Sequence, residues 1–253
     1  MPTPTNRIEF IDTAYDPLTF DQVVERLAAV TSDTPYGYLV TPNVDHVVRL
    51  DRSAESLPQL RRIYAEADLC VCDSRVLSRL ARLQGLRLPV VPGSDLTQYL
   101  LDHVVRPGDR IAIVGGEAPL LPALQAAYPQ IDFVQHIPPM GLVRNPAARH
   151  EAAAFIAAQR PRFSFIAVGS PQQELIASET KQQPGATGMA LCIGAALEFA
   201  TGQLARAPRL MQTLGLEWAH RLASAPRRMW RRYLIEGPRI FILAARWRRR
   251  ASR

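Results

Sequence analysis

The sequence predicts an α/β protein: a Rossmann-like parallel sheet covered by helices on both faces, followed by a basic helical C-terminal appendage. Three observations lead to this prediction. Short apolar runs alternate with amphipathic helical stretches through the first 200 residues. These runs contain few polar positions, which is typical of strands buried on both faces of a parallel sheet. After Gly202 the strand pattern stops and only helical stretches follow. We therefore divide the chain into an α/β domain, residues 1–200, and an appendage, residues 201–253.

Each element is predicted from its local pattern. Apolar runs of strand length give the predicted strands Tyr36–Thr41, Asp68–Cys72, Arg110–Gly115, Ile131–His136, Phe163–Gly169 and Met189–Ile193. Stretches of helical period give the predicted helices Phe20–Val30, Leu57–Ala67, Ser74–Gln84, Asp95–Val105, Pro119–Ala127 and Ala147–Ala158. In the appendage we predict helices over Leu210–Ala223 and Arg227–Arg248, with Pro208, Pro226 and Pro238 starting or kinking them.

Composition restricts the class of protein. Hydrophobic residues make up 47% of the chain, which is enough for a buried core. The three cysteines, Cys70, Cys72 and Cys192, are too few for a disulfide framework or a structural zinc site, so we expect small core side chains in a reduced, cytoplasmic setting. Residues 1–16 lack a signal-peptide pattern, and no stretch approaches the ~18 apolar residues of a membrane span. We expect a soluble or peripheral protein.

Charge is distributed very unevenly along the chain. From Arg206 to Arg253 there are 13 arginines against Glu217 and Glu236, a net charge of +11. Because the whole chain carries +7, the first 205 residues carry −4. The appendage uses only arginine as its basic residue, and the guanidinium fork suits contacts with phosphate. The appendage is therefore predicted to contact phosphate groups.

Polar residues follow two of the predicted strands, where ligands bind in an open parallel sheet. Thr41 and Asn43 lie at a strand-to-helix turn and are suited to hydrogen-bond a ligand hydroxyl or amide, although Asn43 alone also fits a helix cap. Asp73 follows the next strand and opens a helix. It is either a helix cap or a general base that takes a proton from a substrate hydroxyl, and the local pattern does not separate these roles.

Two further turns carry weaker signals. Gly115 and Gly116 stand between a strand and a helix, where they suit either close approach of a phosphate or a plain tight turn. The segment from Gly169 to Glu174 places Pro171 at the first turn of a helix, with Gln173 and Glu174 expected near the cleft. Polar residues of this kind are common at helix starts.

Together these segments resemble the WecG/TagA/CpsF family of bacterial glycosyltransferases, which includes the GumM-type enzymes. The resemblance runs from about Thr41 to Tyr233 and includes Thr41, Asn43, Asp73, the segment Pro92–Leu96, and the G-x-P-x-Q-E element from Gly169 to Glu174. Its most specific part is the ordered C-terminal series Gly202, Arg206–Pro208, Leu216–Trp218, Arg221, Pro226–Arg228 and Arg232–Tyr233.

The resemblance implies an inverting enzyme that moves a hexose from a UDP-sugar to a sugar on undecaprenyl diphosphate. It implies that Asp73 is the general base, that Thr41, Asn43 and Gln173 belong to the catalytic site, and that C-terminal arginines, foremost Arg206, Arg221 and Arg228, stabilise the diphosphate. The other predicted substrate-binding residues are Gly115, Gly116, Gly169, Glu174, Glu217 and Arg232. No cofactor and no metal are expected, and the sequence has no D-x-D motif.

Three positions depart from the family pattern. Val90 stands where many relatives have arginine, Ser74 where glycine is frequent, and Gln172 where lysine is usual. These differences bear on the donor sugar, for which the family implies N-acetylmannosamine, its uronic acid or glucose.

The appendage mixes apolar and basic residues in a way that fits a helix lying in a membrane interface. Its apolar members are Trp230, Leu234, Ile235, Ile240, Phe241, Leu243 and Trp247. We expect docking on anionic lipid at the inner face of the cytoplasmic membrane; the alternative is a solvated basic helix packed on the domain. Self-association would also shelter these residues. A nucleic-acid-binding protein is disfavoured by the acidic domain, and an NAD-dependent dehydrogenase by the incomplete glycine fingerprint.

Overall fold

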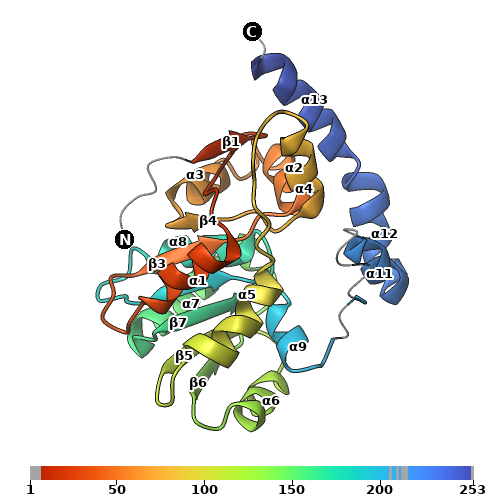
Figure 1. Cartoon of the computed structure of the whole chain (residues 1–253). Helices are drawn as coiled ribbons and strands as arrows, with labels where there is room; N and C mark the ends of the chain where they lie inside the picture. Colours follow the sequence, from red (N-terminus) through yellow and green to blue (C-terminus); the bar gives the residue numbers. More distant parts are fainter. Residues whose placement is uncertain (1–6, 205–206, 209–210, 212–215, 252–253) are drawn as a thin grey trace.

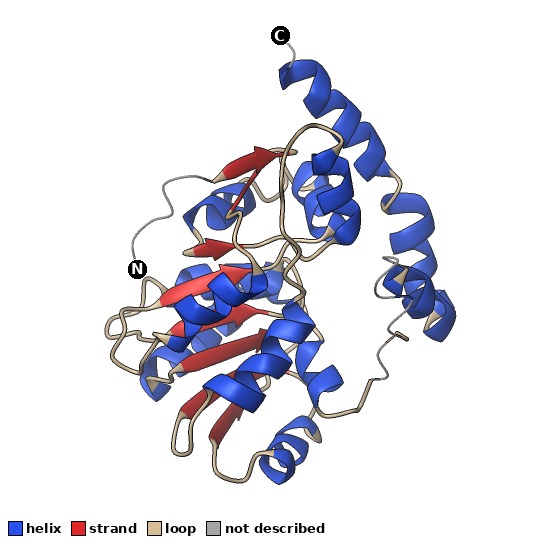
Figure 2. Cartoon of the chain, viewed as in Figure 1, coloured by secondary structure: helices blue, strands red, loops and turns tan. Residues whose placement is uncertain are grey.

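The computed structural model describes residues 7–204, 207–208, 211 and 216–251. Its centre is a six-stranded sheet in the order β4-β3-β8-β7-β5-β6, in which every neighbouring pair is parallel (Figure 2). The strands are β3 (Gly37–Val40), β4 (Leu69–Cys70), β5 (Arg110–Gly115), β6 (Asp132–His136), β7 (Phe163–Ala167) and β8 (Met189–Cys192). The predicted Rossmann-like α/β fold is confirmed, and the six predicted strands coincide with these within a few residues.

Helices cover both faces of the sheet. One face carries α1 (Phe20–Ala28), α5 (Gly93–Tyr99) continued by η1 (Leu100–Val104), α6 (Leu120–Ala127) and α9 (Ala196–Ala200). The other face carries α2 (Val44–Arg52), α3 (Gln59–Glu66), α4 (Arg75–Arg82), α7 (Pro146–Gln159) and α8 (Gln172–Thr180), with η2 (Leu142–Arg144) before α7. Figure 1 shows α1, α5 and α6 in front of the sheet and α7 and α8 behind it.

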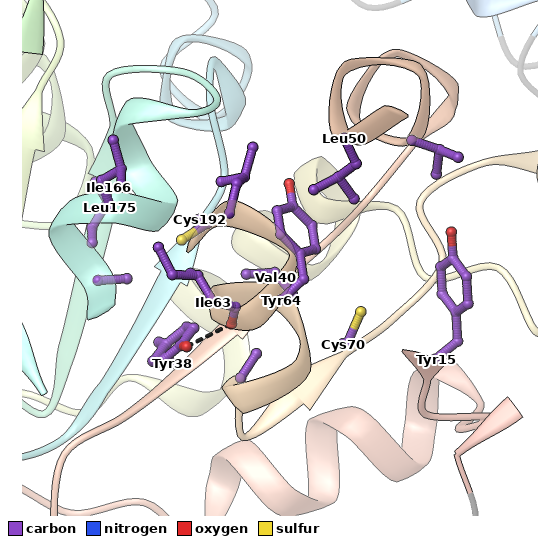
Figure 3. Packing of buried hydrophobic residues seen from close by; sticks show 14 of the residues in the cluster. Tyr15, Tyr38, Val40, Leu50, Ile63, Tyr64, Cys70, Ile166, Leu175 and Cys192 are labelled. Carbon is purple, nitrogen blue, oxygen red and sulfur yellow. Dashed lines mark hydrogen bonds between the residues drawn. The ribbon is translucent and has the colours of Figure 1, made fainter. Parts of the chain in front are cut away.

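The core consists of two hydrophobic clusters, one on each face, because successive strand residues point to opposite sides. In β3, for example, Tyr38 and Val40 belong to the α3–α8 face and Leu39 to the α1–α5 face. The Tyr38 hydroxyl donates to the Ile63 carbonyl at 2.6 Å, which ties α3 to the sheet (Figure 3). Burial in these clusters explains why the strands read as continuous apolar runs.

The cysteines belong to the same packing. Cys70, Cys72 and Cys192 are free thiols, all buried on the α3–α8 face, as predicted (Cys70 and Cys192 are drawn in Figure 3). Desolvation raises the pKa of Cys72 to about 12, so this thiol stays protonated at neutral pH.

An antiparallel hairpin of β1 (Ile8–Phe10) and β2 (Thr13–Tyr15) precedes the sheet and was not predicted. Strands of three residues are too short to show an alternating pattern. The hairpin is joined to β4 through Asp16, whose carboxylate accepts from the Cys70 N–H at 2.7 Å and pairs with Arg7 at 3.1 Å. This connection brings the hairpin beside the strand that leads to Asp73.

The appendage runs along one side of the molecule, drawn in blue in Figure 1, as α11 (Glu217–Ser224), α12 (Pro226–Trp230), η3 (Arg231–Glu236) and α13 (Arg239–Ala251). Pro226 opens α12 and Pro238 precedes α13, close to where the sequence predicts helix starts or kinks. Ile240, Leu243 and Ala244 of α13 are buried in the core, and the Trp247 ring meets Phe10 edge-on at 5.3 Å. In the described part of the chain, no helix is both long and apolar enough to cross a bilayer.

Ion pairs join the appendage to α2. Arg232 pairs with Asp45 at 3.1 Å, Glu236 with Arg52 at 2.5 Å, and Arg239 with Asp51 at 3.6 Å. In contrast to α13, neither α11 nor η3 has a buried residue. The appendage is therefore anchored through α13 and held over the sheet edge mainly by charge.

Candidate active site

A cavity of about 440 Å³ lies between the domain and the appendage, beyond the carboxyl ends of β3 and β4. Its domain wall is formed by Asn43, Val44, Asp45, Asp73, Ser74, Arg75, Val76, Val90, Pro92 and Ser94. Its appendage wall is formed by Glu217, Trp218, Arg221, Arg232, Tyr233, Leu234, Gly237, Pro238, Ile240 and Phe241. The cavity thus combines charged groups with a broad apolar surface, and both parts of the chain are needed to form it.

Asp73 lies in the domain wall, directly after β4. Of its two predicted roles, capping belongs instead to Ser74, whose hydroxyl accepts from the Leu77 N–H at 3.2 Å. The backbone N–H of Asp73 donates to the Pro42 carbonyl at 3.1 Å, which fixes the residue between two strand ends. Its half-buried carboxylate is left facing the cavity.

The surroundings of Asp73 shift its pKa strongly. The net effect raises the pKa to about 7; desolvation is the main cause, and the nearby carboxylates of Glu217 and Asp95 act in the same direction. The Arg221 guanidinium and a hydrogen bond from the Gly93 backbone act in the opposite direction. A carboxylate with a pKa near neutrality is suited to take up and release protons at physiological pH.

Asn43 lines the cavity and caps α2 at the same time. Its side-chain oxygen accepts from the N–H groups of Asp45 at 3.1 Å and His46 at 3.4 Å. The cap uses only this oxygen, so the amide nitrogen remains as a donor for a ligand. The two alternatives that the sequence left open are compatible at this position.

Thr41 lies beneath the site rather than in the cavity wall. Its buried hydroxyl donates to the Cys192 carbonyl at 3.3 Å. A Cβ added to Gly93 would lie 3.1 Å from the Thr41 hydroxyl oxygen, so Thr41 and the Gly93 turn are closely packed. Because the Gly93 backbone hydrogen-bonds the Asp73 carboxylate, Thr41 supports the turn that positions Asp73.

Gln173 and Glu174 form a buried hydrogen-bond cluster that does not line the cavity. The Gln173 oxygen accepts from the Gly194 N–H at 3.0 Å, and its amide nitrogen donates to Glu174 at 3.0 Å. The Tyr64 hydroxyl donates to the same Glu174 oxygen at 2.9 Å. These contacts connect the start of α8 with α3 and with the end of β8.

The three predicted glycines also lie outside the cavity wall. Gly115, Gly116 and Gly169 have φ values of +96°, +73° and +76°, a region that favours glycine. A Cβ on Gly115 would lie 2.6 Å from Val168, and one on Gly116 would overlap Leu120. At Gly115 and Gly116 the turn geometry and the packing of α6 are sufficient to require glycine.

The appendage contributes to the cavity three of the residues for which the family resemblance implies substrate binding, namely Glu217, Arg221 and Arg232. The Arg221 guanidinium lies over the Phe199 ring at 5.3 Å, and that of Arg232 over the Tyr233 ring at 5.6 Å. Arg206 lies outside the described residues. Of Arg228 only the backbone, within α12, is described.

Several cavity residues were not singled out from the sequence, namely Asp45, Arg75, Trp218 and Tyr233. Burial alone would raise the pKa of Asp45, but the guanidinium groups of Arg232 and Arg49 lower it overall. The rings of Trp218 and Tyr233 lie 6.2 Å apart. Both aromatic residues belong to the C-terminal series of motifs, so their position in that series was the available signal.

A model of the glycosyl transferase WecG/TagA/CpsF family matches residues 8–253, which include the sheet, the cavity and the whole described appendage. The chain belongs to this family, as the sequence motifs indicated. It is therefore a glycosyltransferase of cell-surface polysaccharide synthesis, a class that uses a nucleotide-sugar donor and a lipid-linked acceptor.

Proposed function

We propose that the protein transfers a hexose from a UDP-sugar to a sugar on undecaprenyl diphosphate, with inversion at the anomeric carbon and Asp73 as the general base. The observation that carries this proposal is the carboxylate of Asp73, which faces a cavity shared with Arg221 and Arg232 and has a pKa of about 7. A base and cationic groups on opposite walls suit an acceptor hydroxyl and a departing diphosphate.

In the proposed reaction, Asp73 removes the proton from the acceptor hydroxyl as its oxygen attacks the anomeric carbon. The bond from that carbon to the diphosphate breaks, and its electron pair leaves with UDP. Attack and departure on opposite sides of the carbon give inversion. The protonated Asp73 then releases its proton to solvent.

The departing diphosphate gains negative charge, which Arg221 and Arg232 are placed to stabilise. Both guanidinium groups remain charged at physiological pH. We propose that they take the role of a divalent metal, with Arg206 and Arg228 as further contributors, so that transfer requires neither metal nor cofactor. Chelation with EDTA should then leave the rate unchanged.

The experiment that tests this function is an assay of UDP release with a synthetic prenyl-diphosphate-linked acceptor. The donor panel contains UDP-linked N-acetylmannosamine, its uronic acid and glucose, which are the sugars that the family resemblance implies. One of them should support turnover that depends on the acceptor. Turnover with none of them, by protein whose folding has been verified, would contradict the proposed function.

We further propose that the appendage docks the enzyme on anionic lipid at the inner face of the cytoplasmic membrane. Its exposed apolar residues support this, since Trp230, Leu234, Ile235, Phe241 and Ile242 are each 50–59% exposed. Ile240, Leu243 and Trp247, which we also expected at a lipid surface, instead pack on the domain. For this face of α13, the alternative stated from the sequence, a helix packed on the domain, describes the structure.

Vesicle flotation tests the docking. The triple variant Trp230→Ser, Leu234→Ser, Phe241→Ser should lose binding to anionic vesicles while its melting temperature is unchanged. The matched control is Met140→Ser, which removes an apolar residue that is 94% exposed on the domain. Unchanged flotation of the triple variant would contradict docking through this surface. If the wild type binds no vesicles and the triple substitution converts it from a dimer to a monomer, the surface serves self-association instead.

A further inference from the structure

Arg75 is a cationic residue of the cavity that the proposed mechanism does not use. It is the first residue of α4 and comes two positions after Asp73. Its side chain is half-buried and lines the cavity from the domain side. The other cavity arginines for which side chains are described, Arg221 and Arg232, both belong to the appendage.

The contacts of Arg75 differ from those of the appendage arginines. Arg232 has a carboxylate partner in Asp45 at 3.1 Å, and Arg221 lies over an aromatic ring at 5.3 Å. Over the described ranges of the chain, Arg75 has neither an ion pair nor a side-chain hydrogen bond to the protein. A guanidinium keeps its charge under all physiological conditions, and partial removal from water is unfavourable when no oxygen accepts its N–H groups. Its five donors are therefore available to a ligand in the cavity.

From this geometry we propose that Arg75 binds a phosphate oxygen of the diphosphate group carried by one of the two substrates, an inference that rests on the proposed function. The planar fork of N–H donors matches phosphate oxygens, and the anionic group that the proposed donor and acceptor share is a diphosphate. The source is either the nucleotide diphosphate of the donor or the prenyl diphosphate of the acceptor.

The position of Arg75 is fixed by the core and not by the appendage. Ser74 caps α4 at 3.2 Å, and Leu77 and Ala81 bury the inner face of the same helix in the core cluster. Arg75 is therefore in place whether or not α11 and η3 lie over the cavity. This makes it suited to hold a diphosphate before the appendage arginines contact the ligand.

Arg75 and Arg221 also differ in their relation to Asp73. Arg221 is the strongest influence that lowers the pKa of Asp73, and Arg75 is not among the principal groups acting on it. Removing the charge of Arg75 should therefore weaken ligand binding without moving the pH at which Asp73 ionises. A residue that merely supported the fold of α4 would show the reverse pattern, with lower stability and unchanged affinity.

Isothermal titration of UDP and, separately, of farnesyl diphosphate to the full-length protein tests the proposal. Arg75→Gln should weaken the binding of one of these ligands by roughly 10- to 100-fold, the usual range for one charge-assisted contact. Weaker binding of UDP places Arg75 beside the donor, and weaker binding of farnesyl diphosphate places it beside the acceptor. The control is Arg82→Gln, which removes the same charge from an exposed position of α4 outside the cavity and should change neither affinity.

Three results would decide against the inference. Equal affinity of Arg75→Gln and the wild type for both ligands excludes phosphate binding by Arg75. An equal loss of ligand affinity in Arg82→Gln shows that the affinity depends only on the net charge of α4. A melting temperature of Arg75→Gln far below that of the wild type and of Arg82→Gln would show that any loss of affinity reflects damage to α4 and not a lost phosphate contact. If the wild type itself binds neither ligand and transfers no sugar, the proposed function fails first and independently.

Discussion

The two walls of the cavity are built in different ways. On the domain side, Asp73 stands at the end of a strand whose residues are fully buried, between hydrophobic clusters on both faces of the sheet. On the appendage side, α11 and η3 contribute Arg221 and Arg232 without a buried residue of their own. Asp73 is therefore anchored directly to the core, whereas the cationic wall lies over the cavity without core packing of its own.

The energies of these two arrangements differ accordingly. Fully burying one large apolar side chain contributes about 1.5–3 kcal/mol, and the domain buries dozens of them. An exposed ion pair contributes about 0.2–1 kcal/mol and weakens as salt is added. The pairs of Arg52 with Glu236 and of Arg239 with Asp51 are partly exposed and of this second kind, whereas Asp45, the partner of Arg232, is only 11% exposed. Because α11 and η3 bury no residue of their own, displacing them should cost less than disturbing the surroundings of Asp73. We therefore expect that the cavity can open for a lipid-linked substrate while Asp73, the proposed base, stays in place.

The largest effect on turnover is expected when Asp73, the proposed general base, is replaced. Asp73→Asn keeps the shape of the side chain but cannot accept the proton, so turnover should fall by roughly 10²- to 10⁴-fold. The affinity for UDP, measured by titration calorimetry, should be unchanged because the nucleotide contacts remain. Turnover within a few-fold of the wild type would show that another group accepts the proton.

The stability of the same variant provides its control. The pKa of Asp73 in the folded state, about 7, is higher than its value of about 4 in the unfolded chain. The folded state therefore binds the proton more tightly, and the carboxyl destabilises the fold increasingly as the pH rises from about 4 to 7. Asp73→Asn should melt at a higher temperature than the wild type at pH 8 and at the same temperature at pH 4. A lower melting temperature at both values would mean that the loss of turnover reflects damage to the fold.

A second prediction compares the loss of stability when a buried side chain is shortened in the sheet and in α13. Leu191→Ala, within β8, should lower the free energy of global unfolding in urea by about 2–5 kcal/mol. Ile240→Ala removes an equally buried side chain from α13 but should cost roughly 1–2 kcal/mol globally, since α13 can separate locally. Limited proteolysis should then cut residues 216–251 of Ile240→Ala faster than those of Leu191→Ala. Equal urea midpoints and equal cleavage would show that the two regions unfold as one unit.

The third prediction uses the pH dependence of kcat/KM to test whether α11 of the appendage lies close to Asp73. Because only ionised Asp73 accepts a proton, kcat/KM of the wild type should rise with pH and level off above about 7. Glu217→Gln removes a negative charge that raises the pKa of Asp73, so this acid limb should move to lower pH. Arg221→Gln removes a positive charge that lowers the pKa, so the limb should move to higher pH. Shifts in the same direction, or none in either variant, would indicate that α11 does not face Asp73 in the active enzyme.

The strands of the sheet can be predicted from the sequence more fully than the residues of the site, for physical reasons. Arg110–Gly115 matches β5 because the buried residues of this strand give a continuous apolar signal. The hairpin at Ile8–Tyr15 gives no such signal, because each of its strands has three residues.

The position of Asp73 could be predicted because parallel strand ends meet at one edge. Whether a polar residue faces the cavity or the core depends on contacts distant in sequence, such as that between Gln173 and Gly194. For this reason Thr41, Gln173 and Glu174 were expected in the site, whereas the structure places all three outside the cavity wall. Arg75 gave no signal, since an arginine in the first turn of a helix normally faces solvent.

The smallest effect is expected from the ion pairs that hold the appendage to α2. The double variant Asp51→Asn, Glu236→Gln removes the carboxylates that pair with Arg239 and Arg52. All four side chains are partly exposed, so the melting temperature should change little, by the equivalent of at most about 1 kcal/mol.

The KM for the donor should nevertheless rise a few-fold at low salt, because the cationic wall spends less time over the cavity. Added salt should raise the KM of the wild type toward that of the variant, since it screens the same pairs. The control is Asp132→Asn, which breaks a somewhat more exposed pair with Arg110 at the opposite edge of the sheet and should leave KM unchanged at every salt concentration. A KM that rises equally in the control, or a wild-type KM that is independent of salt, would mean that α13 alone holds the appendage in its working position.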